Sequence, residues 1–149
     1  MLDKNGYEIL TGDIVEIKNA YFKSDNGLYF VRHSAGDPDW LGSDHSLKKI
    51  SKNGKIRKSK NSTGFWPIMV TVNDREKRAA AKEWNRKNAT IEIVTGINTS
   101  DIAKYFLEQS EYAKSRIEFF QYQRGENNEV TQLNIRIKKH YDLLANRLS

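Results

Sequence analysis

The sequence of 149 residues contains no cysteine. This absence excludes a disulfide scaffold, a thiolate metal site and cysteine catalysis. No apolar run approaches the roughly 18 residues of a membrane span, and the opening MLDKNGYEIL lacks the apolar core of a signal peptide. We therefore expect a cytoplasmic protein with no membrane partner.

Motifs of catalysis and cofactor binding are also missing. The chain has only three histidines, and neither a phosphate-binding glycine loop nor a dinucleotide fingerprint occurs. Ser34 and Ser43 each have a histidine nearby, but no Gly-x-Ser-x-Gly turn accompanies them. The sequence therefore predicts a protein that is not an enzyme and carries no cofactor.

One loop gathers groups that are able to bind a cation. Carboxylates and imidazoles at this density could hold a divalent ion, or the acids could mimic phosphates. Their spacing matches no established site, and Asp-Pro and Ser-Asp pairs are ordinary turn formers. We interpret the loop as turn chemistry and predict no metal there; its residues are His33, Asp37, Asp39, Asp44 and His45.

The charge distribution is the strongest feature that is present. The net charge is +6, yet residues 1–47 sum to −4, residues 48–87 to +10 and residues 88–149 to zero. All the excess positive charge therefore lies in the middle forty residues. Such a localised basic block is typical of a protein that binds phosphates or an acidic partner.

The first part of the chain reads as β-rich. Alternating or β-branched runs predict strands, and the turn signals Asn26-Gly27 and Asn53-Gly54 separate some of them. A cationic helix is expected at 75–87, with Ala80, Ala81 and Trp84 as its inward stripe. The predicted strands are 12–18, 28–33, 46–50, 65–72 and 90–94.

This order, together with the opening Leu10-Thr11-Gly12-Asp13-Ile14-Val15-Glu16-Ile17, resembles small SH3-like barrels of the KOW type. In such barrels four strands are followed by a short helical turn and a closing strand. The resemblance covers residues 7–95. It implies an α+β protein with a five-stranded barrel, here with a longer inserted helix, as the domain 1–95.

The second part predicts a helical hairpin at 99–149. Thr99-Ser100-Asp101 is a concentrated helix start, and Gly125 suits a helix end. Apolar residues recur every three or four positions on both sides of Gly125, so two antiparallel helices are expected. Extra apolar residues, such as Tyr112 and Phe119, must pack on the barrel or on a second copy of the chain.

Two sets of cations are the candidate binding residues for nucleic acid or an acidic partner. The turn set holds seven cations in thirteen positions without an acid, and the helix set follows one helical face at steps of three and four. Lysine predominates, which suits phosphate contact better than base readout. The turn set is Lys48, Lys49, Lys52, Lys55, Arg57, Lys58 and Lys60; the helix set is Arg75, Arg78, Lys82 and Arg86.

Two functions remain open from the sequence. The first is a non-enzymatic module that contacts nucleic acid, or a nucleoprotein complex, through residues 48–87. The second is a phage or mobile-element protein that inhibits a bacterial nucleoprotein or nuclease defence complex by protein contacts, in the manner of an anti-CRISPR protein. A homodimer through the C-terminal helices is compatible with either function.

Overall fold

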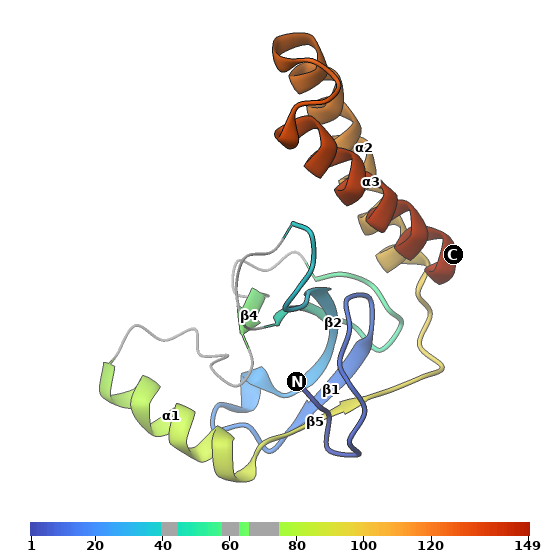
Figure 1. Cartoon of the computed structure of the whole chain (residues 1–149). Coiled ribbons are helices and arrows are strands. Elements are labelled where there is room, and N and C mark those ends of the chain that lie inside the picture. The colour runs from blue at the N-terminus through green and yellow to red at the C-terminus, as the bar shows by residue number, and fades with distance from the viewer. Residues whose placement is uncertain (40–44, 58–62, 66–74) are drawn as a thin grey trace. The chain divides into compact units, whose positions relative to one another are not determined.

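The computed structural model describes residues 1–39, 45–57, 63–65 and 75–149 (Figure 1). The chain divides into two compact units, Met1–Asn98 and Thr99–Ser149. In the described residues the first unit contains the sheet, the short 3₁₀ helix Lys23–Asp25 and one α-helix, and the second contains two α-helices. No helix in the described ranges is long and apolar enough to cross a membrane.

The sheet of the first unit is antiparallel throughout. Four strands of four to seven residues form its body, and the three-residue β4 extends it beyond β3. The order is β4-β3-β2-β1-β5, so consecutive strands are neighbours and β5 returns to pair with β1. The strands are β1 Ile14–Lys18, β2 Gly27–His33, β3 Ser46–Ile50, β4 Thr63–Phe65 and β5 Thr90–Ile93.

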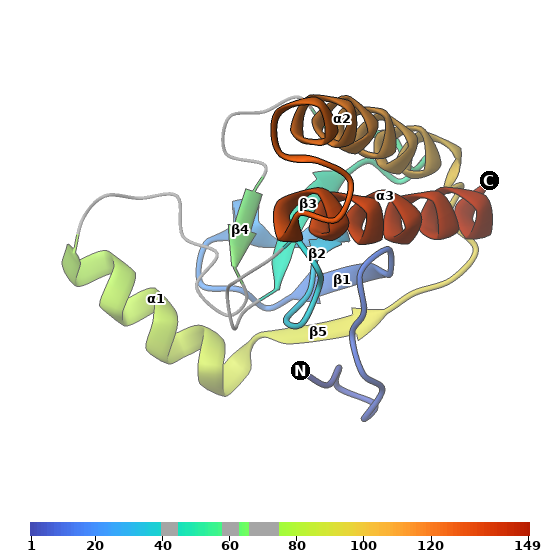
Figure 2. The same cartoon turned by 45° about the horizontal axis from the view of Figure 1, so that its top comes forward.

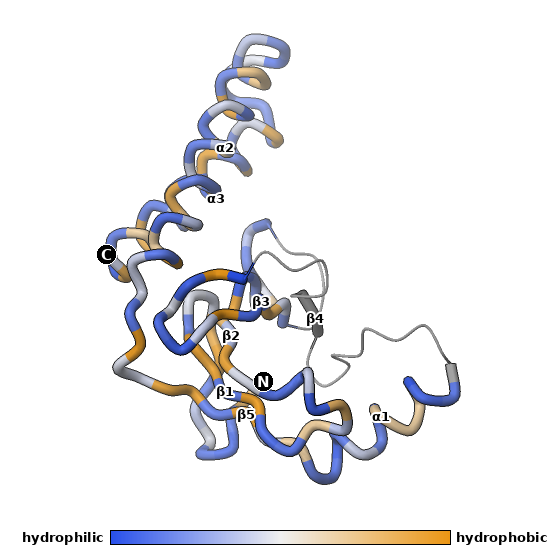
Figure 3. The backbone as a smooth tube through the Cα atoms, turned by 180° about the vertical axis from the view of Figure 1, so that it is seen from behind, coloured by the Kyte–Doolittle hydropathy of each residue, from blue (hydrophilic) through white to orange (hydrophobic). Residues whose placement is uncertain are grey.

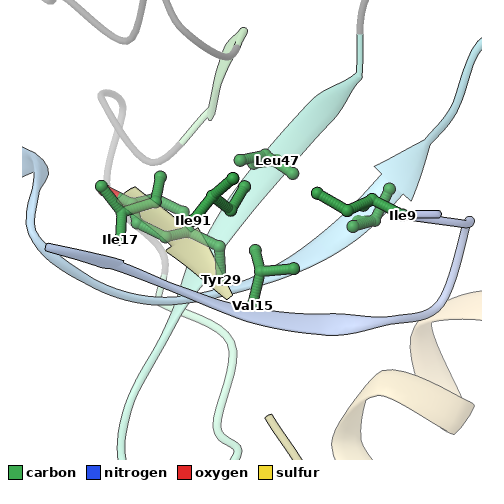
Figure 4. Close-up of a cluster of buried hydrophobic side chains, with 7 residues drawn as sticks. Ile9, Val15, Ile17, Tyr29, Leu47 and Ile91 are labelled. Carbon is green, nitrogen blue, oxygen red and sulfur yellow. The ribbon is translucent and has the colours of Figure 1, made fainter. Parts of the chain in front are cut away.

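One face of this sheet carries a cluster of buried hydrophobic side chains. The ladder pairs Val15 with Tyr29 and Val31 with Leu47, so alternate residues of neighbouring strands lie on the same face. Figure 4 shows these side chains converging over the sheet. The buried cluster is Ile9, Val15, Ile17, Tyr29, Val31, Leu47 and Ile91.

The expectation of an α+β protein is confirmed, whereas a closed five-stranded barrel is not. In the described residues β4 and β5 are the two ends of the strand order, and no ladder joins them. The predicted strand 65–72 overlaps β4 only at Phe65, and its remainder lies outside the described residues. The structure therefore supports an antiparallel sheet rather than a closed barrel.

Helix α1, Arg75–Asn88, projects from the sheet between β4 and β5 (Figures 1 and 2). Ala81 is fully buried and Asn85 is 2% exposed. The predicted inward stripe is wrong at Ala80, which is exposed, and only partly right at Trp84, which is 46% exposed. Positions 81 and 85 lie one turn apart, so a narrow strip of α1 faces the protein.

The second unit is the predicted antiparallel hairpin of α2, Ser100–Arg124, and α3, Glu129–Leu148. Phe106 is fully buried and stacks on Tyr141 with ring centroids 5.9 Å apart. Gly125 ends α2 at φ 87°, a conformation that glycine adopts without strain. Figure 3 shows hydrophobic and hydrophilic residues alternating along both helices, as amphipathic packing requires.

Candidate nucleic-acid interface

The turn set begins on β3 and continues through a tight turn. Ser51 and Lys55 close the turn, since the backbone N–H of Ser51 donates to the carbonyl of Lys55 over 2.8 Å. Gly54, at φ 78°, stands so close to the Asn98 carbonyl that a Cβ would lie 1.8 Å from that oxygen. The turn is therefore held in place, and it exposes Lys52, Lys55 and Arg57 to solvent.

Lys49 differs from the other cations of the turn set because its side chain forms contacts within the first unit. Its register partner on β2 is Tyr29, so its side chain lies on the core face. The ammonium donates to the carbonyl of Ser24 over 2.5 Å and lies 5.7 Å from the Tyr29 ring centroid. Partial burial, with Arg57 nearby, lowers the pKa of Lys49. Lys49 therefore stabilises the fold through these contacts and also adds to the positive charge of this surface.

Asp25 is the acid beside Lys49. It is only 6% exposed, and its Oδ2 accepts no hydrogen bond from the described residues. Burial raises the pKa of Asp25 to about 6, and the Lys49 charge opposes this shift. The hydroxyl of Tyr29 donates to the backbone carbonyl of Asp25 over 2.8 Å rather than to its carboxylate. The sequence alone did not single out Asp25 as a titrating group.

On α1 the cations divide into paired and unpaired ones. Glu83 accepts from Arg86 at 2.9 Å and from Lys87 at 3.2 Å, and these hydrogen bonds lower the pKa of Glu83. Arg78 and Lys82 are exposed and form no ion pair with any described residue. Among the described side chains of α1, these two cations are therefore available to a ligand.

A single segment, Asn19 to Asp25, borders both sets. Trp84 of α1 donates its indole N–H to the carbonyl of Asn19 over 3.0 Å, and Asn85 accepts the N–H of Tyr21 over 2.8 Å. Lys49 contacts the same segment at Ser24. The structure thus connects the two sets through one short stretch of backbone within the first unit.

The remaining candidates are placed less fully. Lys48 lies on β3, opposite Phe30 in the ladder, and is partly exposed. Lys58 and Lys60 lie outside the described residues. Arg75 is the first residue of α1, and the structure describes its backbone only.

Three of the five residues in the loop of acids and histidines lie close together in the structure. One ligand atom each from His33, Asp37 and Asp39 lies within 4.8 Å of the others, and His33 Nδ1 is 3.2 Å from Asp39 Oδ2. Nitrogen and oxygen donors at this separation have the chemistry to hold a divalent ion. His45 is buried outside this group, and Asp44 lies beyond the described residues.

Asp37 also has partners that the sequence could not reveal. Its carboxylate accepts from the backbone N–H of Ser34 at 2.9 Å and from the hydroxyl of Thr11. Thr11 is 26 positions away in the chain, and its neighbour Gly12 donates its backbone N–H to the carbonyl of Val31 on β2 over 2.8 Å. These bonds fix the loop that begins after β2.

Comparison with known proteins adds no further constraint to these observations. No protein-family model, no curated protein and no solved structure matches the chain.

Proposed function

We propose that the protein is a non-enzymatic binding module that contacts nucleic acid through the basic residues of 48–87. The observation that carries the proposal is the exposure of cations in both sets that form no ion pair with a described residue: Lys52, Lys55 and Arg57 on the turn, with Arg78 and Lys82 on α1. Each cation that meets a phosphate releases condensed counterions, which favours binding at low salt.

The distribution of charge between the two units supports the same function. The eight acids and eight bases of residues 88–149 cancel, whereas the surplus of ten lies in residues 48–87, which belong to the first unit. A uniform surplus would serve solubility, but a local one raises the concentration of a polyanion at one surface. The predominance of lysine favours contact with phosphates over recognition of a base sequence.

The sheet supports an SH3-like arrangement as the scaffold of this module. Consecutive strands pair in a meander, a helix interrupts the chain before the last strand, and that strand returns to β1. We infer an SH3-like sheet whose inserted helix is α1. The turn set and α1 are then two connections of one small scaffold, and binding residues are often found on connections.

A salt titration tests the proposal. The protein is titrated into fluorescent DNA and RNA of mixed sequence between 50 and 300 mM salt, with the Lys55→Gln/Arg57→Gln/Lys58→Gln variant beside it. We expect steep salt dependence, and a slope on duplex DNA lowered by up to roughly 2.7 in the variant, at about 0.9 for each lost contact. Binding that is undetectable at 50 mM salt for every nucleic acid would refute the proposal.

One observation favours a second candidate function, which is binding of another protein through α2. The bound protein would be a different partner or a second copy of this chain. Large apolar side chains of α2 are exposed: Leu107 at 51%, Tyr112 at 63%, Phe119 at 58% and Tyr122 at 88%. Exposed clusters of this kind are common at protein interfaces. The solution mass of the protein, measured alone and after Phe119→Ser, tests the dimer. A mass of one chain at high concentration would exclude it.

A further inference from the structure

The part of α1 that precedes Ala81 carries none of the packing of this helix. Glu76, Lys77, Arg78, Ala79 and Ala80 are all exposed, and Ala81 is the first α1 residue that is buried. At 1.5 Å per residue these five residues extend about 8 Å beyond Ala81. A helix that is anchored in one half can present the exposed side chains of its other half to a ligand.

The anchor of α1 is polar and lies in its second half. Asn85 accepts the Tyr21 N–H, the Trp84 indole donates to the Asn19 carbonyl, and Trp84 meets the Tyr21 ring edge-on with centroids 6.5 Å apart. These contacts orient the helix without covering its first turn and a half. The exposed end is thus held by directional bonds rather than by a broad apolar face.

The exposed half of α1 has the shape and charge that duplex DNA requires. Arg78 and Lys82 lie on adjacent turns of one face, while Ala79 and Ala80 add almost no bulk beside them. An α-helix is about 10–12 Å wide with its side chains. The major groove of B-form DNA is about 12 Å wide and about 8.5 Å deep. The projecting length and width of α1 match these dimensions.

We propose that α1 enters the major groove of duplex DNA with the part that precedes Ala81. Arg78 in that part, and Lys82 one turn further along the same face, then meet the phosphates at the groove wall. This inference rests on the proposed function and specifies its ligand as B-form DNA. The small alanines let the helix backbone come close to the base edges, where an alanine methyl can contact a thymine methyl. The major groove of an RNA duplex is too deep and narrow to admit side chains, so RNA duplexes are disfavoured.

The experiment compares a 20-base-pair DNA duplex with the RNA duplex of the same sequence at one salt concentration. Wild-type protein is measured beside Ala79→Trp, whose added bulk blocks entry of the helix. Ser115→Trp, an equal addition on the exposed side of α2, is the matched control. Lys82→Gln removes one cation with little change in volume. Circular dichroism and a thermal melt establish that each variant is folded.

We expect at least tenfold tighter binding of wild-type protein to the DNA duplex than to the RNA duplex. Ala79→Trp should lose most of that preference, Lys82→Gln should weaken DNA binding severalfold, and Ser115→Trp should leave both unchanged. Equal affinity for both duplexes, or DNA binding that Ala79→Trp leaves intact, overturns the inference while the proposed function stands. Binding to neither duplex nor single strand overturns the proposed function itself. If Ala79→Trp unfolds, Lys82→Gln alone decides the role of α1.

Discussion

Helix α1 and the hairpin of α2 and α3 use charged residues in opposite ways. The hairpin packs along its length through apolar side chains such as Phe106, Ile137 and Leu144, and the charges of residues 88–149 cancel. Helix α1 buries little beyond Ala81 and Asn85 and carries six cations against two acids. The hairpin is therefore held together by a buried apolar core, whereas most side chains of α1 are exposed and many of them are charged.

Removing a core side chain from the hairpin should give the largest effect on stability. Leu144 is 6% exposed and its neighbour Leu143 is 64% exposed. Leu144→Ala should lower the free energy of unfolding of the hairpin by about 2–5 kcal/mol, because it leaves a cavity. Leu143→Ala should stay within about 0.5 kcal/mol.

Far-UV circular dichroism during urea unfolding measures this difference. The matched pair removes the same atoms from adjacent positions, so helix propensity cancels. Equal effects of the two substitutions would show that the inward face of α3 is assigned wrongly. Leu133→Ala, at a partly exposed position of the same helix, should fall between them.

The anchor of α1 should give a smaller effect. Asn85→Ala leaves the partly buried N–H of Tyr21 without its acceptor, at a cost of about 1 kcal/mol. Asn88→Ala, three positions further along the same helix and exposed, is the matched control. All three tryptophans precede residue 99, so their fluorescence reports unfolding of the first unit. If both variants melt together with wild-type protein, Asn85 does not anchor the helix.

The acid beside Lys49 should produce an effect of comparable size that depends on pH. The pKa of Asp25 is raised by burial to about 6 from its ordinary 3.8, so the folded protein holds this proton more tightly than the unfolded chain. Stability therefore falls as pH rises from about 4 to about 6 and is then level. Asp25→Asn should remove this fall and leave the first unit more stable at pH 8 by about 1–2 kcal/mol.

Unfolding of the first unit in urea at pH 4, 6 and 8, followed by tryptophan fluorescence, provides the measurement. Asp101→Asn, at a partly exposed position at the start of α2, controls for the loss of one negative charge. A pH profile that Asp25→Asn leaves unchanged between 4 and 6 would contradict the burial of this carboxyl group.

The elements could be predicted from the sequence wherever the signal is local. The strand at 46–50 has its predicted bounds, the strand at 28–33 starts one residue earlier, and the helix from 75 ends at Asn88 rather than Lys87. Gly125, with its positive φ, marks the end of α2 as expected. The spacing of apolar residues, the turn residues and the helix caps depend only on neighbours in the chain, so these features can be recognised in the sequence.

Features that depend on distant residues could not be predicted. Lys49 reads as one cation among seven, and only the ladder with β2 places its ammonium over Tyr29 and against Ser24. From the sequence, Asn85 is interpreted as a polar surface residue. In the structure it is buried, and its side chain accepts a hydrogen bond from the backbone N–H of Tyr21 in the segment after β1. Ala80 and Ala81 are equivalent by composition, and the packing of the helix alone distinguishes them.

In the proposed function the cations of α1, together with those of the turn set, make the contact with nucleic acid, whereas total charge alone does not. The most direct test measures the salt dependence of duplex DNA binding for two matched variants, Arg78→Gln/Lys82→Gln on α1 and Lys104→Gln/Lys114→Gln on α2. Each lowers the net charge from +6 by two, and all four positions are exposed. We predict that the α1 variant lowers the slope of log affinity against log salt by about 1.8 and that the α2 variant leaves it nearly unchanged. An equal loss in both variants, or a loss in neither, would contradict the account.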